Sequence, residues 1–255
     1  MTVRVLTILA VAGAVGTAPT VKMRYRVDQT IEQAVDASAI GGGQQQQHFS
    51  VSTFLSVTLT DTTGGKVVSA VVDSMRADSA PVPKAVLDSA RGTPFHGLLD
   101  AAGRVSEVKA LRDTPLAPQL TDVITRLYPG LRAGLKVGDG WTDTTQSSSP
   151  ASGGSMTISR ITSYKATGTE DRREGKALKV ETAFTSNVSG TQQTPGGPAQ
   201  IEGSGSGTGA HYVGSDGRYL GGGYSVTTKL TLAGAFAPQP LPVTVTETFA
   251  VSALQ

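Results

Sequence analysis

The residues able to do acid–base or metal chemistry are few and scattered. The three histidines are His48, His96 and His211, and none lies near another in the sequence. A three-histidine zinc site would need all of them to converge, and no His-Glu-x-x-His pair occurs. We therefore predict no metal ligands and expect exposed or hydrogen-bonded histidines.

Serines and glycines are plentiful, but their spacing does not match the common nucleotide or nucleophile motifs. The run Gly203–Gly207 has serine at the wrong positions for a Gly-x-Ser-x-Gly nucleophile elbow. Gly205 to Ala210 matches a Gly-x-Gly-x-x-Ala phosphate loop, but it precedes an expected strand and not a helix. We interpret this segment as a flexible strand edge and predict no cofactor.

One aromatic residue stands between two acids. Asp139 and Asp143 flank Trp141, the only tryptophan in the chain. Paired carboxylates beside an aromatic side chain can hydrolyse glycosidic bonds. However, Gly138-Asp139-Gly140 is typical of a turn entering a strand, and a single tryptophan usually belongs to the core. We predict no catalytic residues, and the sequence by itself identifies no ligand-binding residue.

Charge and cysteine content exclude further classes of site. Lysine and arginine total 22 against 20 acidic residues, and a net charge of +2 is too small for a nucleic-acid-binding surface. We therefore expect no nucleic-acid partner. The absence of cysteine excludes disulfides, thiolate catalysis, cysteine-ligated zinc and a lipid-modified cysteine.

The N-terminal segment has the pattern of a signal peptide. Arg4 precedes a short apolar run that ends at Val15, and small residues stand before a cleavage position at Thr17. A buried first strand is the alternative interpretation. No later segment approaches the ~18 continuous apolar residues of a spanning helix. We expect residues 1–16 to be a signal peptide, a periplasmic or extracellular location, and no transmembrane segment in the mature chain.

Most of the remaining chain alternates apolar and polar residues with the period of a β-strand. Threonine and serine together exceed a fifth of the residues, which also favours strands over helices. Strands are predicted over residues 21–28, 49–60, 66–76, 155–169, 177–189, 210–213, 218–232 and 241–253. Asp216-Gly217 predicts a tight hairpin. Loops are predicted at 41–47, which contains four glutamines, and at 147–154 and 190–200.

Two short helices interrupt the strands, at residues 82–91 and at about 115–128. Thr114 is expected to cap the second helix, with Pro115 at its first position. Its apolar stripe, which predicts core packing, is formed by Leu116, Leu120, Val123, Ile124 and Leu127.

The strand pattern before this second helix resembles the pattern after it. The two segments, at about residues 21–112 and 134–253, each contain long strands, a Gly-Lys turn and a hairpin with an aspartate–glycine tip. We predict a single mainly-β domain over residues 17–255, a curved antiparallel sheet (half-barrel) of two β-meanders with one or two short packing helices.

The segment Leu127-Tyr128-Pro129 followed by Val137-Gly138-Asp139-Gly140-Trp141 resembles a Val-Gly-Asp-x-Trp motif of uncharacterised exported bacterial β-proteins. The layout is also similar to that of LolA/LolB/LppX-type lipoprotein carriers, whose incomplete curved sheet is closed by helices around an apolar cavity. The chain lacks the anchor cysteine of LolB and LppX, although LolA is unanchored.

The resemblance implies a non-enzymatic exported envelope protein that binds or carries an apolar, lipid-like ligand under the sheet. Adjacent valines such as Val67-Val68 and Val71-Val72 support it, because a sheet that is apolar on both faces needs cover on each. The alternative is a structural or adhesive secreted β-protein with a filled core and no ligand.

The signal-peptide prediction is tested by the mass of the protein purified from its host. We expect a mature chain that begins near Thr17 and lacks Arg4. An intact mass that retains residues 1–16, in a cytosolic fraction, would contradict both export and an envelope location.

Overall fold

The structure is a computed structural model that describes residues 19–38, 41–78, 82–151, 154–173, 175–194, 197–234 and 239–254. The predicted signal peptide, residues 1–16, and the cleavage position at Thr17 lie outside these ranges. No helix within the described ranges has the length and apolar character needed to cross a membrane.

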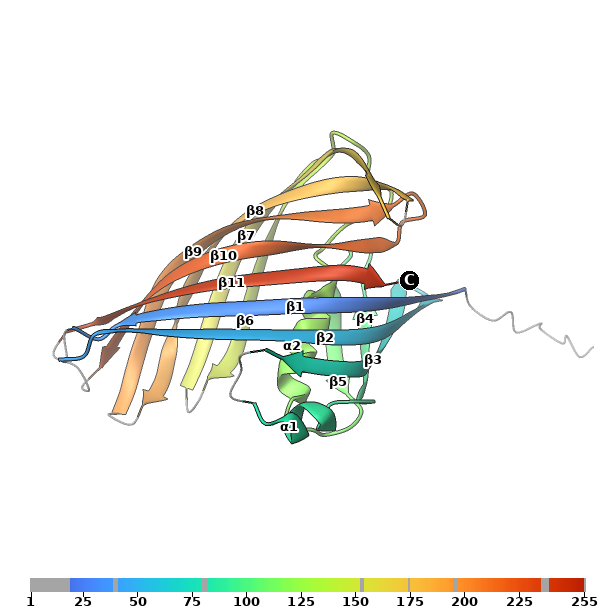
Figure 1. Cartoon of the computed structure of the whole chain (residues 1–255). Coiled ribbons are helices and arrows are strands. Elements are labelled where there is room, and N and C mark those ends of the chain that lie inside the picture. The colour runs from blue at the N-terminus through green and yellow to red at the C-terminus, as the bar shows by residue number, and fades with distance from the viewer. Residues whose placement is uncertain are drawn as a thin grey trace, which may run out of the picture.

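The described residues form eleven strands and two helices (Figure 1). The first meander and the helices are β1 (Thr20–Asp36), β2 (Gln44–Thr62), β3 (Gly65–Ala77), α1 (Lys84–Ser89), β4 (Pro94–Leu99), β5 (Val105–Ala110) and α2 (Ala117–Leu127). The second meander is β6 (Gly140–Ala151), β7 (Gly154–Arg172), β8 (Gly175–Thr194), β9 (Gly197–Gly214), β10 (Tyr219–Gly234) and β11 (Leu241–Leu254).

All eleven strands belong to one antiparallel sheet in the order β5-β4-β3-β2-β1-β11-β10-β9-β8-β7-β6. Each meander pairs neighbours in the chain, and β1 pairs with β11 to join the two meanders. The sheet curls so that β6 and β7 lie behind β1 and β2, and it stays open, with β5 and β6 as its edges (Figure 1). The predicted curved antiparallel sheet of two meanders is confirmed; the similarity of the two halves stays a prediction.

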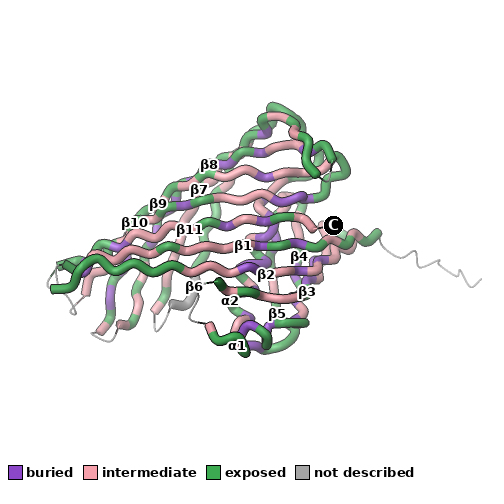
Figure 2. The backbone as a smooth tube through the Cα atoms, viewed as in Figure 1, coloured by how far each residue is buried: buried purple, intermediate pink, exposed green. Residues whose placement is uncertain are grey.

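The core lies on the concave face of the sheet, under its middle strands (Figure 2). The buried odd-numbered residues of β1 and β2, such as Tyr25, Val27, Leu55 and Val57, belong to the same core as the α2 stripe, as the alternation predicts. Fully buried members include Tyr25, Leu55, Phe95, Leu120, Ile124 and Leu127. The apolar stripe of α2 therefore packs against the sheet and does not face solvent.

α2 begins two residues later than the sequence suggests. Thr114 and Pro115 lie in the preceding turn, and Leu116 occupies the cap position without a side-chain hydrogen bond. Pro118 takes the first turn, where a missing amide proton costs nothing. The helix ends at the residue before Tyr128, whose extended backbone is the conformation that a following proline favours.

The glycine-rich segment that was predicted as a flexible strand edge is instead an interior strand. β9 pairs with β8 on one side and β10 on the other, and Gly203, Gly205, Gly207 and Gly209 face the concave side. Because these residues have no side chain, the ring of Phe184 lies directly over β9. The glycines thus let the Phe184 ring of β8 meet the Tyr224 ring of β10 across β9, with centroids 5.6 Å apart.

Three predicted loops are largely strand. Gln44 to Gln47 pair with Asp36 to Gln33 at the end of the β1–β2 hairpin. Residues 147–151 belong to β6, and most of 190–200 belongs to β8 and β9. The loop predictions were wrong because hydrogen bonds between paired strands continue past the core to the ends of these hairpins. Strand pairing there does not depend on burial of the side chains.

The expectation that both faces of β3 are covered is also wrong. Val68 and Val72 are 1% and 0% exposed on the concave side, but Val71 on the other face is 37% exposed. The convex face therefore carries an uncovered valine, and the apolar cover lies on the concave side.

Replacing Gly207 by alanine tests the role of the β9 glycines. A Cβ atom there would lie within 3.0 Å of the carbonyl oxygen of Ser225 and of the Phe184 ring. We expect Gly207→Ala to lower the free energy of unfolding by roughly 1–3 kcal/mol, measured in urea. The control is Gly168→Ala, where a Cβ atom meets nothing within 4 Å. Equal effects of the two variants would contradict the close approach.

Candidate functional site

The concave side is only partly filled, and the segment after α2 divides the remaining space. Residues 128–139 cross from the first meander to the second, and the amide of Gly138 donates to the carbonyl oxygen of Ala166 in β7 (2.8 Å). Tyr128 and Pro129 line both of the cavities found there. These two residues therefore form the wall between the cavities.

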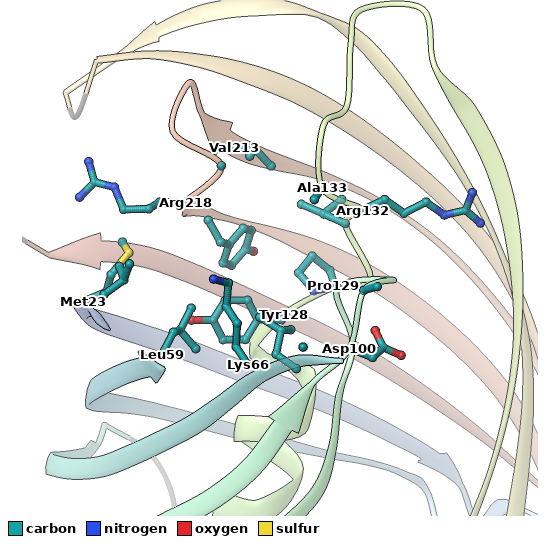
Figure 3. Close-up of a pocket in the computed structure, with 18 of the residues that line it drawn as sticks. Met23, Leu59, Lys66, Asp100, Tyr128, Pro129, Arg132, Ala133, Val213 and Arg218 are labelled. Atoms are coloured by element: carbon teal, nitrogen blue, oxygen red, sulfur yellow. The ribbon is translucent and has the colours of Figure 1, made fainter. Parts of the chain in front are cut away.

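The first space, the end cavity, lies where the turns of several strands meet, and its volume is about 240 Å³ (Figure 3). Its apolar lining includes Val21, Met23, Leu59, Leu99, Leu131 and Val213. Figure 3 shows Arg132 and Arg218 at its rim, with their guanidinium groups directed away from it. Lys66 and Arg218 form ion pairs with Asp61 and Asp216. The end cavity is therefore mainly apolar, with its charges at the rim.

The second space, the flank cavity, runs along α2 on the other side of the wall and has a volume of about 610 Å³. Strands of both meanders line it, from β1 and β11 to β6, β7 and β8. Its apolar and aromatic lining includes Ile31, Ile158, Tyr164, Phe184, Tyr224 and Val245. Its charged lining consists of Arg104, Asp122, Arg126, Asp143, Arg160 and Glu247. The flank cavity is therefore larger than the end cavity and amphipathic.

Three tyrosines hold the wall in place. The ring centroids of Tyr25, Tyr128 and Tyr219 lie 5.8–6.2 Å apart, and the Tyr25 hydroxyl donates to the carbonyl oxygen of Tyr219 (2.9 Å). Burial raises the pKa of Tyr128 to about 12. These hydroxyls stay protonated at neutral pH, so the cluster acts as a packed aromatic wall and not as a source of nucleophiles.

Arg126 ties α2 to the strands behind it. Its guanidinium group donates to the hydroxyl of Tyr224 (2.8 Å) and to the carboxylate of Glu247 (2.6 Å), and it pairs with Asp122 (2.6 Å). It also lies 4.7 Å from the centre of the Phe249 ring. Burial acts to lower the pKa of Arg126, but Tyr224 and the two carboxylates raise it above its ordinary value. Arg126 is therefore a charged anchor of the helix that is paired through its terminal nitrogens, while its Nε atom is buried without a hydrogen-bond partner among the described residues.

The two carboxylates beside Trp141, Asp139 and Asp143, have different partners. Asp143 pairs with Arg104 (3.1 Å), which connects the beginning of β5 with β6 at the edges of the sheet. Asp139 accepts a hydrogen bond from the amide of Lys136 (2.8 Å) in a turn. The carboxylates suggested for glycoside hydrolysis are thus engaged in an ion pair and a turn.

Trp141 is not the core residue that the sequence suggests. It is half-buried, its ring stacks on that of Tyr164 with centroids 4.6 Å apart, and Arg132 lies 5.5 Å from its centre. The sequence-based expectation failed because β6 is an edge strand, where one neighbour is missing and a large ring stays accessible.

The histidines have three different environments. His48 is exposed and lies 3.6 Å from Glu32, and His96 is exposed on β4. His211 is 4% exposed, lines the flank cavity, and its Nδ1 lies 3.1 Å from the Tyr219 hydroxyl. Within the described ranges, no group of three His, Cys, Asp or Glu side chains could hold a metal ion.

The residues that line the flank cavity could not be named from the sequence. They come from α2 and from strands at both ends of the chain, so only the fold brings them together. The one available signal was the position of Arg160 among alternating residues of β7, which places it on the same face as Ile158 and Tyr164.

No family model matches the chain, and no curated protein matches it. Among solved structures, it is similar to Pseudomonas aeruginosa OccK5 (OpdH), with a TM-score of 0.21 and 10% identity. It is also similar to Pseudomonas aeruginosa OccK2 (OpdF) in complex with glucuronate, with a TM-score of 0.22 and 7% identity. Each match covers 92% of this chain and 98% of the other. At these TM-scores the likeness carries no inference about function.

The burial of His211 predicts a loss of stability in acid. Burial lowers its pKa to about 4, whereas the unfolded chain takes up the proton near the ordinary value of about 6.5. The neutral form stabilises the fold above pH ~6.5, and this contribution is lost as the pH falls toward 4.

We expect wild type to lose roughly 2–3 kcal/mol more than His211→Asn between pH 7 and pH ~4.5, measured by urea unfolding. His96→Asn is the control, because it is the same substitution at an exposed position of β4. Identical pH profiles for wild type and His211→Asn would contradict a buried neutral imidazole.

Proposed function

We propose that this protein is a non-enzymatic, exported β-protein of the cell envelope that binds an apolar or amphiphilic small molecule in the flank cavity. The observation that carries the proposal is the space of about 610 Å³ between α2 and the concave face of the sheet. Small-molecule sites typically occupy ~300–1,000 Å³, and the end cavity falls below that range.

The side chains that line the flank cavity support its interpretation as a ligand-binding site and not as a packing defect of the core. Phe184, Tyr224 and Tyr164 provide aromatic walls, while threonines at positions 145, 162 and 182 leave room between them. A core meant only to be filled would carry larger apolar residues at those inward positions, because interiors pack as densely as organic crystals. The lining thus combines apolar surface with a few polar groups, as ligand sites do.

The absence of enzymatic activity is part of the same proposal. His48 lies near a carboxylate and His211 near a tyrosine hydroxyl, and within the described ranges no histidine is hydrogen-bonded to a serine or threonine hydroxyl. The carboxylates Asp143 and Glu247 in the flank cavity are paired with arginines. Neither arrangement provides an activated nucleophile or a free general base.

Export and the likeness to LolA/LolB/LppX-type carriers complete the proposal. A curved antiparallel sheet with a helix under its concave face is the layout that the resemblance to these carriers implies. Export rests on the signal-peptide pattern of residues 1–16. The ligand class follows from the cavity and not from the layout.

Filling the flank cavity with a tryptophan tests the proposal. Ile158 on β7 lines the cavity, whereas Ile161 on the same strand is 50% exposed on the convex face. We expect native mass spectrometry of the gently purified protein to show bound host lipid in wild type and in Ile161→Trp. The extra mass should be absent from Ile158→Trp, because its ring occupies the space.

A thermal melt distinguishes loss of ligand from loss of fold, and Ile158→Trp should melt within a few degrees of ligand-free wild type. The contrary result is a wild type without bound lipid, together with an Ile158→Trp variant destabilised by roughly 1–3 kcal/mol. That outcome would favour the structural or adhesive alternative with a filled core.

A further inference from the structure

One charged side chain of the flank cavity lacks a partner. Arg160 projects from β7 onto the concave side and lines the cavity. Within the described ranges it forms no ion pair, and its Nε atom is buried without a hydrogen-bond acceptor. Leaving a buried donor on a charged group unpaired is costly, so such a group is expected to meet an acceptor when the protein is in use.

The other charged groups of the cavity are all paired. Arg104 binds Asp143, and Arg126 binds both Asp122 and Glu247. Each of the three carboxylates therefore has an arginine other than Arg160 within ion-pair distance. Among the described charged residues of the lining, which are three arginines and three carboxylates, Arg160 is the one without an ion pair.

Aromatic contacts hold the guanidinium group of Arg160 in place. Its central carbon lies 4.6 Å from the centre of the Phe184 ring and 5.9 Å from that of Tyr224. Stacking engages the face of the guanidinium plane and leaves the donors along its edge free. Thr145, which is directly opposite Arg160 in the β6–β7 pairing, also lines the cavity and offers a hydroxyl as a further donor.

We propose that Arg160 binds the carboxylate of a fatty-acid-like ligand whose alkyl chain occupies the flank cavity. A guanidinium edge matches a carboxylate in a bidentate geometry. Ile158, Phe184 and Val245 would contact the chain. A single negative charge fits best, because Asp143 and Glu247 lie in the same lining and repel a dianion such as a phosphate monoester. This inference rests on the proposed function and specifies its ligand.

The experiment compares laurate with dodecanol, two probes with the same alkyl chain, by isothermal titration calorimetry on the delipidated protein. We expect wild type to bind laurate at least about tenfold more tightly than dodecanol. This is the ratio of dissociation constants that one charge-assisted hydrogen bond produces. Arg160→Gln should bind dodecanol as wild type does and lose the preference for laurate. Arg160→Lys should keep part of the preference, because it keeps the charge but not the fork.

Arg76→Gln is the matched control, since Arg76 also lies over a phenylalanine ring, that of Phe54 at 5.7 Å, but is exposed and not in the flank cavity. It should leave both affinities unchanged. If Arg160→Gln does not fold, the test rests on Arg160→Lys. If that variant and wild type bind laurate with equal affinity, the role of Arg160 is overturned.

The outcomes separate the two proposals. Equal binding of laurate and dodecanol to wild type would overturn the role of Arg160 and leave ligand binding by the cavity intact. Binding of neither probe would overturn the proposed function and this inference with it. Tighter binding of dodecyl phosphate than of laurate would replace the carboxylate by a phosphate as the recognised group.

Discussion

The burial of α2 against the concave face of the sheet is the interaction on which the other features depend. Leu120, Ile124 and Leu127 are 0–1% exposed, and they cover Tyr25, Val57 and their neighbours on the middle strands. However, α2 has 11 residues and the strands behind it reach 20, so one helix cannot cover the whole face. The sheet beyond the helix must be covered by its own curvature or by something else, and the flank cavity is the space that remains.

Curvature and the unpaired arginine are connected through β9. Its inward glycines allow the Phe184 ring to lie across the strand, between β8 and β10, at the place where the sheet bends. That ring in turn supports the guanidinium group of Arg160. Irregular pairing next to Gly221 and Gly168 adds to the bend, since bulges increase local twist. The feature that shapes the sheet thus also positions the proposed recognition group.

The sequence predicts those elements whose signal is local. Alternation in β1 and β2, the stripe of α2 and the Asp216-Gly217 turn, where Gly217 has φ 78°, are found as expected. The glutamines of β2 and the glycines of β9 were misjudged, because hydrogen bonding to a neighbouring strand outweighed their poor strand propensity. The lining of the flank cavity comes from residues as distant as Ile31 and Glu247, and no local pattern connects them. The partial exposure of Trp141 was not predicted, because only the topology shows that β6 is an edge strand.

A crystal structure of the protein grown with laurate tests most directly whether the space beside α2 is a ligand site. We expect alkyl-chain density in the flank cavity, with a carboxylate oxygen within about 3 Å of the Arg160 guanidinium group. Laurate bound only elsewhere, or a flank cavity closed by side chains of α2 and β7, would contradict it.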